Sequence, residues 1–535
     1  MVKMKKMLTM LLAATMSLSL VACGSSSSSG ETDTASGNQS GTESGAAVES
    51  FTVGTGNVLG TFMPASSNET SYPGSYLVYD TLFSWDKDGN IYSDILKDWY
   101  YEEDGTTFVM ECRDDVYFAN GDQMTGEDVL YSVKNLVDRQ TVVASNYSTI
   151  DWDNSYVSDD GFTVYLANTS EFGPGIMNMG VLFLLDKSWC DENGFDDLEP
   201  WTQSPNGSGP YEVAEYVTDS HITLQKRDDY WGDYTDGPET FTINYYADTS
   251  AMYMALEQGE IDMALNIAES DYERAVEDDS IGVKETYEGD VILMSMDTEN
   301  NEYLADENVR LAIAYGVNWE EVAESARGEL GEAATSVVTQ KSSYYSNVGA
   351  YEYNPDLAKE YMEKSGYVVD GSTVNFALNM VTVDQEVKKN SATVIQYYLQ
   401  QLGIDLQTDF KDFSSAIEVW NTPGGTDLNF QDTDTGSIVG EPYFALAKFA
   451  SEADPTSTIG IKDETFNELF MDGTMTTDDE QRAAKYEELQ QYCHDSAWII
   501  PMYESVDAIA YNPDVVAECN LYSSVNANPR LIVYK

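Results

Sequence analysis

The chain has 535 residues and is strongly acidic, with 93 Asp and Glu against 27 Lys and Arg and a formal net charge of −66 at pH 7. This charge excludes a nucleic-acid-binding protein, because affinity for phosphate backbones comes from Lys and Arg, and it also repels anionic lipid headgroups. The length is more than one core accommodates and predicts two or three domains.

Residues 1–22 have the pattern of a bacterial secretory signal peptide. Lysines precede an apolar stretch, Met7–Ala22, that is shorter than the roughly 20 residues a membrane-spanning helix needs. The stretch ends in Leu20-Val21-Ala22-Cys23, which resembles the lipobox of bacterial lipoproteins and implies lipidation of Cys23 as the mature N-terminus. An ordinary secretory signal that happens to contain a cysteine is the alternative, but a flexible segment directly behind Cys23 favours the lipid anchor.

Residues 23–50 are predicted to be a disordered tether. The stretch is rich in Ser, Gly and Thr and contains no basic or aromatic residue. It has too little apolar surface to offset the entropy lost on ordering. We therefore expect the folded body to begin near Phe51.

The body opens with a short predicted strand and a glycine-containing turn. Phe51–Val53 is followed by Gly54-Thr55-Gly56-Asn57-Val58-Leu59-Gly60, which invites comparison with a dinucleotide-binding fingerprint. The spacing is GxGxxxG, and the residues around Pro64 do not open an amphipathic helix. We expect no dinucleotide site and no cofactor.

Several later segments have the apolar spacing and the end signals of helices. Thr125 and Asp128 form a capping-box-like start for a helix that reaches Val137. Asn354-Pro355 starts another helix, which Gly366 ends, and a further helix is expected at 479–493.

One predicted helix lies between two predicted strands. The helix covers 384–402, and the strands cover 374–380 and 404–410. A strand, helix and strand in this order form a crossover that favours a parallel sheet. The chain is therefore predicted to have an α/β fold.

Residue types that carry catalysis or bind metals give no distinct signal. The 2 histidines, His221 and His494, are far apart in sequence, and the neighbouring pair Cys493-His494 is no dyad, because adjacent side chains usually point apart. With 93 acidic residues, a chance pair of carboxylates occurs in nearly every window. Asp86–Asn90 and Asp432–Asp434 lack the downstream Glu of a calcium loop and are predicted to be solvated turns. We expect neither an enzyme nor a metal site.

Four cysteines lie in the body: Cys112, Cys190, Cys493 and Cys519. Their wide spacing does not predict a zinc site. Export permits disulfides, and the sequence leaves open the three possible pairings and the fully reduced form.

Short motifs follow one another through the whole body in a fixed order. They are Tyr79–Phe83 with Asp88–Asn90, Phe108–Val133, Gly207–Tyr211, Tyr230-Trp231, Leu256–Asp262, Asp306–Asn318, Leu402–Leu406 and Trp498–Tyr503. This series resembles the family 5 extracellular solute-binding proteins of ABC importers, which include oligopeptide and dipeptide receptors.

The resemblance implies a type II periplasmic-binding-protein fold, with two lobes that close on a ligand like a hinged clamp. The first lobe would comprise 51–292 plus 504–535, with an inserted subdomain at about 76–204, and the second lobe would comprise 293–503. The chain would cross between lobes near Val291–Met296 and Ile500–Tyr503, where few backbone torsions need to change on closure.

One departure from the family concerns the ligand. In the family's peptide receptors, an aspartate shortly before an acidic-Pro pair anchors the peptide's α-ammonium. Here the pair is Glu441-Pro442, and Ile438 stands three residues earlier. Asp434 or Glu441 could replace the anchor, and the departure puts a free peptide N-terminus in doubt.

The resemblance also implies a set of ligand-binding candidates. They lie after the first strand, at the two crossovers and near the acidic-Pro pair: Val58, Leu59, Gly60, Met294, Met296, Asp434, Glu441, Tyr443 and Tyr503. For each candidate, hinge packing or a solvated loop is the alternative.

Together these features predict a lipid-anchored extracellular receptor of an ABC importer. It would be a monomer at the outer face of the bacterial cytoplasmic membrane, on the cell surface or in a periplasm, with a peptide-like solute and a permease as its partners. A receptor for an oligosaccharide or another non-peptide solute is the alternative, followed by a cell-surface hydrolase and by an adhesin or signalling protein on the same fold. The identity of the solute stays open.

Overall fold

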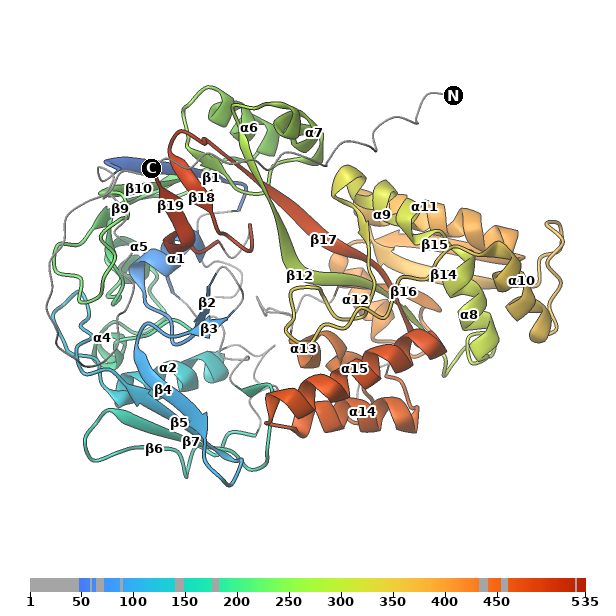
Figure 1. Cartoon of the computed structure of the whole chain (residues 1–535), viewed down its shortest axis with the longest axis horizontal. Helices are drawn as coiled ribbons and strands as arrows, with labels where there is room; N and C mark the ends of the chain where they lie inside the picture. The colour runs from blue at the N-terminus through green and yellow to red at the C-terminus, as the bar shows by residue number, and fades with distance from the viewer. Residues whose placement is uncertain are drawn as a thin grey trace, which may run out of the picture. The chain divides into compact units, whose positions relative to one another are not determined.

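Two long antiparallel strands, β12 (Gly282–Met296) and β17 (Ile499–Tyr511), lie side by side and join the rest of the sheet on both flanks (Figure 1). The computed structural model describes residues 48–57, 60–63, 72–86, 90–139, 149–175, 182–432, 441–453, 460–524 and 527–535. The predicted signal peptide and Cys23 lie outside these residues. No helix in the described part of the chain is long and apolar enough to cross a membrane.

The sheet that contains β12 and β17 has 11 strands, in the order β15-β14-β16-β12-β17-β11-β1-β10-β9-β8, with β13 paired to β17 beside this path. On the β12 side lie β14 (Phe376–Val383), β15 (Ile404–Lys411) and β16 (Leu428–Asp432). On the β17 side lie β1 (Ser50–Thr55), β8 (Tyr211–Val217), β9 (His221–Lys226), β10 (Thr240–Tyr245), β11 (Met263–Ala264) and β13 (Glu332–Ala333).

The crossover predicted in the second half of the chain is confirmed. Helix α11 (Glu386–Gln401) connects β14 to β15, and the two strands pair in parallel with Phe376 opposite Ile404. Its apolar side chains, including Ile395 and Leu399, are buried against the strands. The spacing of the apolar residues was therefore sufficient to predict this strand-helix-strand unit.

The predicted helix starts are also confirmed. Helix α2 (Gly126–Arg139) follows Thr125, whose backbone N and hydroxyl donate to Asp128 Oδ2 at 2.8 and 2.9 Å. Asn354 caps α10 (Pro355–Lys364) by accepting from Leu357 N at 3.1 Å. The helix expected at 479–493 is α15 (Asp479–Ser496).

The other helices cover the sheet or form small groups with one another. They are α1 (Tyr72–Val78), α4 (Lys187–Asn193), α5 (Glu199–Gln203), α6 (Thr249–Glu257), α7 (Glu269–Glu277), α8 (Glu307–Gly316), α9 (Trp319–Arg327), α12 (Phe413–Trp420), α13 (Pro442–Leu446) and α14 (Glu464–Met475). Short 3-10 helices cover Gly328–Leu330, Ala447–Phe449 and Pro529–Leu531.

Three smaller sheets complete the described fold. A four-stranded sheet has the order β4 (Leu96–Tyr101), β5 (Thr107–Cys112), β7 (Thr163–Ala167) and β6 (Tyr156–Val157). Two hairpin-like pairs are β2 (Ser84–Trp85) with β3 (Ile91–Tyr92) and β18 (Val516–Cys519) with β19 (Ile532–Tyr534).

Apolar side chains gather in several cores. The largest packs α8–α11 against β12, β14, β15 and β16. Separate cores lie around β1 and β8–β10, between the four-stranded sheet and α2, among α13–α15, and between α6, α7 and β17. Several cores in one long chain agree with the size at which a single core stops growing.

The four described cysteines are all buried, and none of them forms a disulfide. Burial raises the pKa of the Cys112 thiol to about 12 and that of Cys519 to about 11, and it also raises the pKa of Cys493. Thiols held in the protonated form are poor nucleophiles. Cys112, Cys493 and Cys519 therefore lack the lowered pKa of a reactive thiol.

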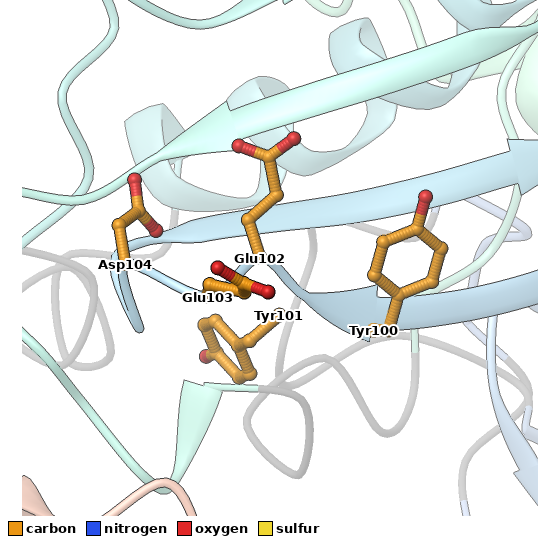
Figure 2. A pocket seen from close by; sticks show the side chains of 5 residues that line it. All are labelled: Tyr100, Tyr101, Glu102, Glu103 and Asp104. Atoms are coloured by element: carbon orange, nitrogen blue, oxygen red, sulfur yellow. The ribbon is translucent and has the colours of Figure 1, made fainter.

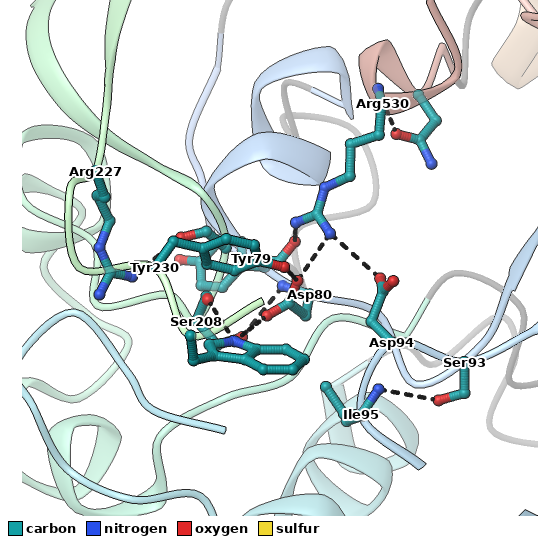
Figure 3. A network of polar contacts seen from close by, with 12 residues as sticks. Tyr79, Asp80, Ser93, Asp94, Ile95, Ser208, Arg227, Tyr230 and Arg530 are labelled. Atoms are coloured by element: carbon teal, nitrogen blue, oxygen red, sulfur yellow. Dashed lines mark hydrogen bonds and ion pairs between the residues drawn. The ribbon is translucent and has the colours of Figure 1, made fainter. Parts of the chain in front are cut away.

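A buried ionic network holds the end of the chain to its first core (Figure 3). Asp80 is fully buried, and its carboxylate accepts from Arg530 Nη1 at 2.8 Å, Tyr230 Oη at 3.0 Å and Trp231 Nε1 at 2.9 Å. Arg530 also reaches Asp94 Oδ2 at 3.3 Å. Burial raises the pKa of Asp94 to about 6, against the opposing charge of Arg530.

This network gives the first prediction. Arg530→Gln should lower the free energy of unfolding by about 3–5 kcal/mol, because it leaves the buried Asp80 carboxylate without its charged partner. Urea denaturation followed by tryptophan fluorescence measures the change. Lys97→Gln is the control: its pair with Asp114 is exposed on both sides, at 52% and 65%, and should contribute at most about 1 kcal/mol. Equal effects of the two variants would contradict the prediction.

Candidate functional site

Three predicted ligand-binding residues lie together on β12 and β17. Met294 pairs with Ile500, and Ile292 pairs with Tyr503 in the same ladder. Met294, Met296 and Tyr503 are all buried in the core formed with α8–α11. Their side chains have the packing role that the sequence also allowed, and a ligand contact by any of them stays a prediction.

Of the candidates just after the first strand and just before the acidic-Pro pair, only Gly60 lies within the described residues. Gly60 is half-buried, and its carbonyl accepts from Tyr216 Oη on β8. Val58, Leu59 and Asp434 lie outside the described residues.

Glu441 is buried and forms an ion pair. It caps α13, where its Oε1 accepts from Tyr443 N at 3.2 Å, and the same oxygen lies 2.5 Å from Arg482 Nη2. Burial raises the pKa of Glu441, and the adjacent guanidinium opposes that shift. Because Arg482 occupies this carboxylate, Glu441 has a charged partner from within the chain.

Arg482 is the centre of this cluster. It lies on α15 with 1% of its side chain exposed, and its Nη1 donates to Gly173 O and Tyr344 Oη, both at 2.9 Å. Its guanidinium carbon lies 4.6 Å from the ring centre of Tyr344. Burial lowers the pKa of Arg482, but the Glu441 carboxylate more than offsets this and raises it overall.

Sequence reasoning missed Arg482, although one signal pointed to it. Arg482 precedes Tyr486, Leu489 and Cys493 at helical spacing, so it lies on the buried face of α15. A charged residue on an apolar face requires a buried partner. That pattern could have found the arginine, but it could not have named Gly173, which lies 309 residues away.

Tyr443 links the same region by aromatic contacts. Its ring packs edge-on against Phe172 at 5.2 Å and stacks with Phe470 at 5.9 Å. Glu441 and Tyr443 thus lie together at the start of α13. Met294 belongs to the core of α8–α11, whereas Tyr443 packs against the core of α13–α15.

The β12–β17 ladder is irregular where the two predicted crossovers meet. The register shifts between Tyr287 and Val291 and again between Ile292 and Leu293. Such irregularities bend a strand and locally change its twist. Strands β12 and β17 are therefore regularly hydrogen-bonded on both sides of a short distorted stretch.

A buried carboxyl group, Glu504, lies beside this stretch, opposite Val291. It accepts from Thr339 Oγ1 at 3.1 Å and from Gln340 N at 3.0 Å. Burial raises the pKa of Glu504 to about 7, and the charge of Glu332 on β13 adds to the shift. Sequence reasoning gave no indication of this group.

A cavity of about 490 Å³ opens at the turn between β4 and β5 (Figure 2). It is lined by Tyr100, Tyr101, Glu102, Glu103 and Asp104. Burial raises the pKa of Tyr101 to about 12, and its hydroxyl donates to Phe172 O at 3.3 Å. The lining contains none of the residues predicted to bind ligand.

The histidines have separate surroundings. His221 contacts Ser220 and Glu215, and His494 stacks on the ring of Tyr351 at 4.5 Å. Among the described residues, no group of three or more His, Cys, Asp or Glu is placed to hold a metal ion. Asp86 Oδ1 accepts from Asn90 N at 2.9 Å, and residues 87–89, on which the predicted turn depends, lie outside the described residues.

This α/β architecture is that of the substrate-binding proteins of ABC transporters. One solved structure of that class, CtaP from Listeria monocytogenes, superposes with a TM-score of 0.76 at 20% identity and covers 91% of this chain and 99% of its own. Residues 90–456 match the profile of the bacterial extracellular solute-binding proteins, family 5. The chain belongs to this family, and its predicted fold class is confirmed.

Two relatives extend the comparison. The nickel-binding periplasmic protein of Escherichia coli is 21% identical over 80% of this chain and 83% of its own. The oligopeptide-binding protein AppA of Bacillus subtilis is 22% identical over 80% of both chains. Members of the family are solute-binding proteins of ABC transporters and are not enzymes.

Glu504 gives a prediction on pH. The pKa of Glu504 is about 7 in the folded protein, against an ordinary value of 4.5 in the unfolded chain. The folded protein therefore holds the Glu504 proton more tightly. The stabilisation from protonated Glu504 is therefore fully present below about pH 4.5 and is lost as the pH rises through about 7. Each unit of difference between the folded and unfolded pKa corresponds to about 1.4 kcal/mol. Glu504→Gln should lose less stability than wild type between pH 5 and pH 8.

Urea denaturation at the two pH values tests this expectation. Glu518→Gln changes an exposed carboxylate on β18 and should keep the wild-type dependence. If Glu504→Gln also kept it, Glu504 would not titrate in this range.

Proposed function

We propose that the protein is a lipid-anchored receptor that captures a peptide-like solute between two lobes and delivers it to the permease of an ABC importer. Membership of family 5 supports the solute-binding role. The proposed first lobe is 51–292 plus 504–535, with a subdomain inserted at about 76–204, and the second lobe is 293–503.

One observation carries the division into lobes. Its two boundaries fall at neighbouring places on paired strands, because Val291 lies opposite Glu504 and Ile292 lies opposite Tyr503. The shifts of register occur at the same place. Few backbone torsions in this short stretch need to change for one lobe to rotate against the other.

The arrangement of the cores also supports the division. The cores around β1 and around the four-stranded sheet take all their buried members from the proposed first lobe. The core of α8–α11 and that of α13–α15 take theirs from the second lobe and from Val291 and Ile292 at its edge. The core of α6 and α7 includes Leu330 and contacts both.

Closure would follow from where the ligand binds. A solute that contacts both lobes does so fully only in the closed form, so its binding energy shifts the equilibrium toward that form. The permease would then recognise the closed receptor. No covalent step is involved.

The relatives do not agree on a solute, because one is named for nickel and the other for oligopeptides. Ile438 stands where the family's peptide receptors have their anchoring aspartate. A blocked or modified peptide fits this replacement better than a free N-terminus does. An oligosaccharide or another small solute is the second candidate for the same reason, and Asp434 stays a predicted contact for a cationic ligand.

Ligand binding is tested by thermal unfolding with a panel of peptides, N-blocked peptides and oligosaccharides. A solute at 100 times its Kd should stabilise the protein by about 2.7 kcal/mol, seen as a rise in Tm. Mass spectrometry should recover the solute intact. A panel without any shift would contradict the binding role, and an altered product would favour the hydrolase.

The lipid anchor is tested by Cys23→Ala. Wild-type protein should be labelled by a fatty-acid precursor in the host and should sediment with membranes, whereas the variant should lose both properties because it lacks the acylated thiol. Cys112→Ala, which changes a buried free cysteine, should keep the label. Unlabelled and freely soluble wild-type protein would overturn the anchor.

A further inference from the structure

A short segment after β7, residues 172–175, contacts three helices that lie far along the chain. Gly173 N donates to Thr474 O on α14 at 2.8 Å, and Gly173 O accepts from Arg482 Nη1 on α15 at 2.9 Å. The ring of Phe172 packs against Tyr443 on α13 at 5.2 Å. Both backbone polar groups of Gly173 are thus satisfied by helices from a distant part of the sequence.

The fit at Gly173 is close. A Cβ on this residue would lie 2.1 Å from Thr476 O and 2.8 Å from Arg482 Nε, distances at which the segment must move away. A glycine is therefore required for the contact, although its backbone is not in the left-handed region. The requirement comes from close approach alone.

The donor on the other side, Arg482, also has partners within its own part of the chain. Arg482 is fixed by the ion pair with Glu441 and by Tyr344, whose own hydroxyl bonds to Asp479 Oδ1 at 3.1 Å. A buried charged donor forms a stronger hydrogen bond to a carbonyl than a neutral donor does. The carbonyl of Gly173 is an acceptor for a guanidinium that needs little further ordering.

The segment is also supported from its own side. Tyr101 on β4 donates to Phe172 O at 3.3 Å, and a Cβ on Gly175 would lie 2.6 Å from the same hydroxyl. Each side of the contact is therefore held by further contacts, with Tyr101 on one side and with Glu441 and Tyr344 on the other.

On the proposed division, residues 172–175 belong to the first lobe and α13–α15 belong to the second. We infer that Gly173 and Arg482, with Phe172 and Tyr443, form a latch that raises the fraction of ligand-free molecules in which the two lobes are closed. This inference rests on the proposed function. A contact present only in the closed form raises the closed fraction, and the apparent affinity for solute rises in proportion to that fraction.

The test measures the distance between the lobes in ligand-free protein. Spin labels are placed on the full chain at two exposed positions, Tyr117→Cys in the first lobe and Val374→Cys in the second. Pulsed electron paramagnetic resonance then compares this labelled protein with the same protein carrying Gly173→Ala. We expect the variant to lose the shorter distance and to populate a longer one.

Two further variants guard against an effect of general destabilisation. Phe172→Ala removes the aromatic contact but leaves Arg482 and its partners unchanged, so it should shift the distance in the same direction even if Gly173→Ala folds poorly. Gly121→Ala strains the backbone at φ +88° but meets no atom within 4 Å, so it should keep the wild-type distance.

The outcomes separate the latch from the proposed function. Unchanged distances in both latch variants would overturn the latch, as would an equal shift in Gly121→Ala. If the latch variants open but no solute shortens the wild-type distance or raises its Tm, the latch stands and the receptor role fails. If solutes bind while the latch variants behave as wild type, the receptor role stands and the latch fails.

Discussion

The hydrogen-bonded pair of β12 and β17 is the constraint on which the rest of the structure depends. Among the described strands, those on the two sides of this pair join one sheet through it, with β16 paired to β12 and with β11 and β13 paired to β17. The ladder is regular at its two ends and shifts register near Ile292 and Tyr503. On the proposed division into lobes, a two-stranded connection with a local irregularity would leave the interior of each lobe fixed and concentrate rotation in a short stretch.

The buried polar groups are of two kinds. Some stabilise a single core, and others join segments on opposite sides of the proposed lobe boundary. Asp80 and Arg530 tie the end of the chain to motifs at Tyr79, Ser208 and Trp231 in the first core. Arg482 instead reaches from α15 to Gly173. The motifs by which the sequence resembles its family thus include residues that hold the first core together, so they identify the family well and carry little information about the solute.

Features that depend on residues close together in the sequence could be predicted, and features that depend on residues far apart in the sequence could not. The crossover from β14 to β15 and the starts of α2 and α10 were predicted because caps and apolar periods are local. The Arg482–Gly173 contact and the burial of Glu504 were not, since each depends on groups brought together across 309 and 165 residues. For the candidate site, sequence placed Glu441 near Tyr443 but could not reveal that Arg482 neutralises it.

The central claim is that the two lobes rotate about the β12–β17 pair when solute binds. Fluorescence energy transfer between one dye at an exposed site of each lobe tests it most directly, with a dye pair inside one lobe as the reference and a solute fraction purified with the protein from its host as the ligand. We expect a shorter mean distance between the lobes on adding that fraction and no change of distance within a lobe. Equal distances with and without solute, for a fraction that demonstrably binds, would contradict it.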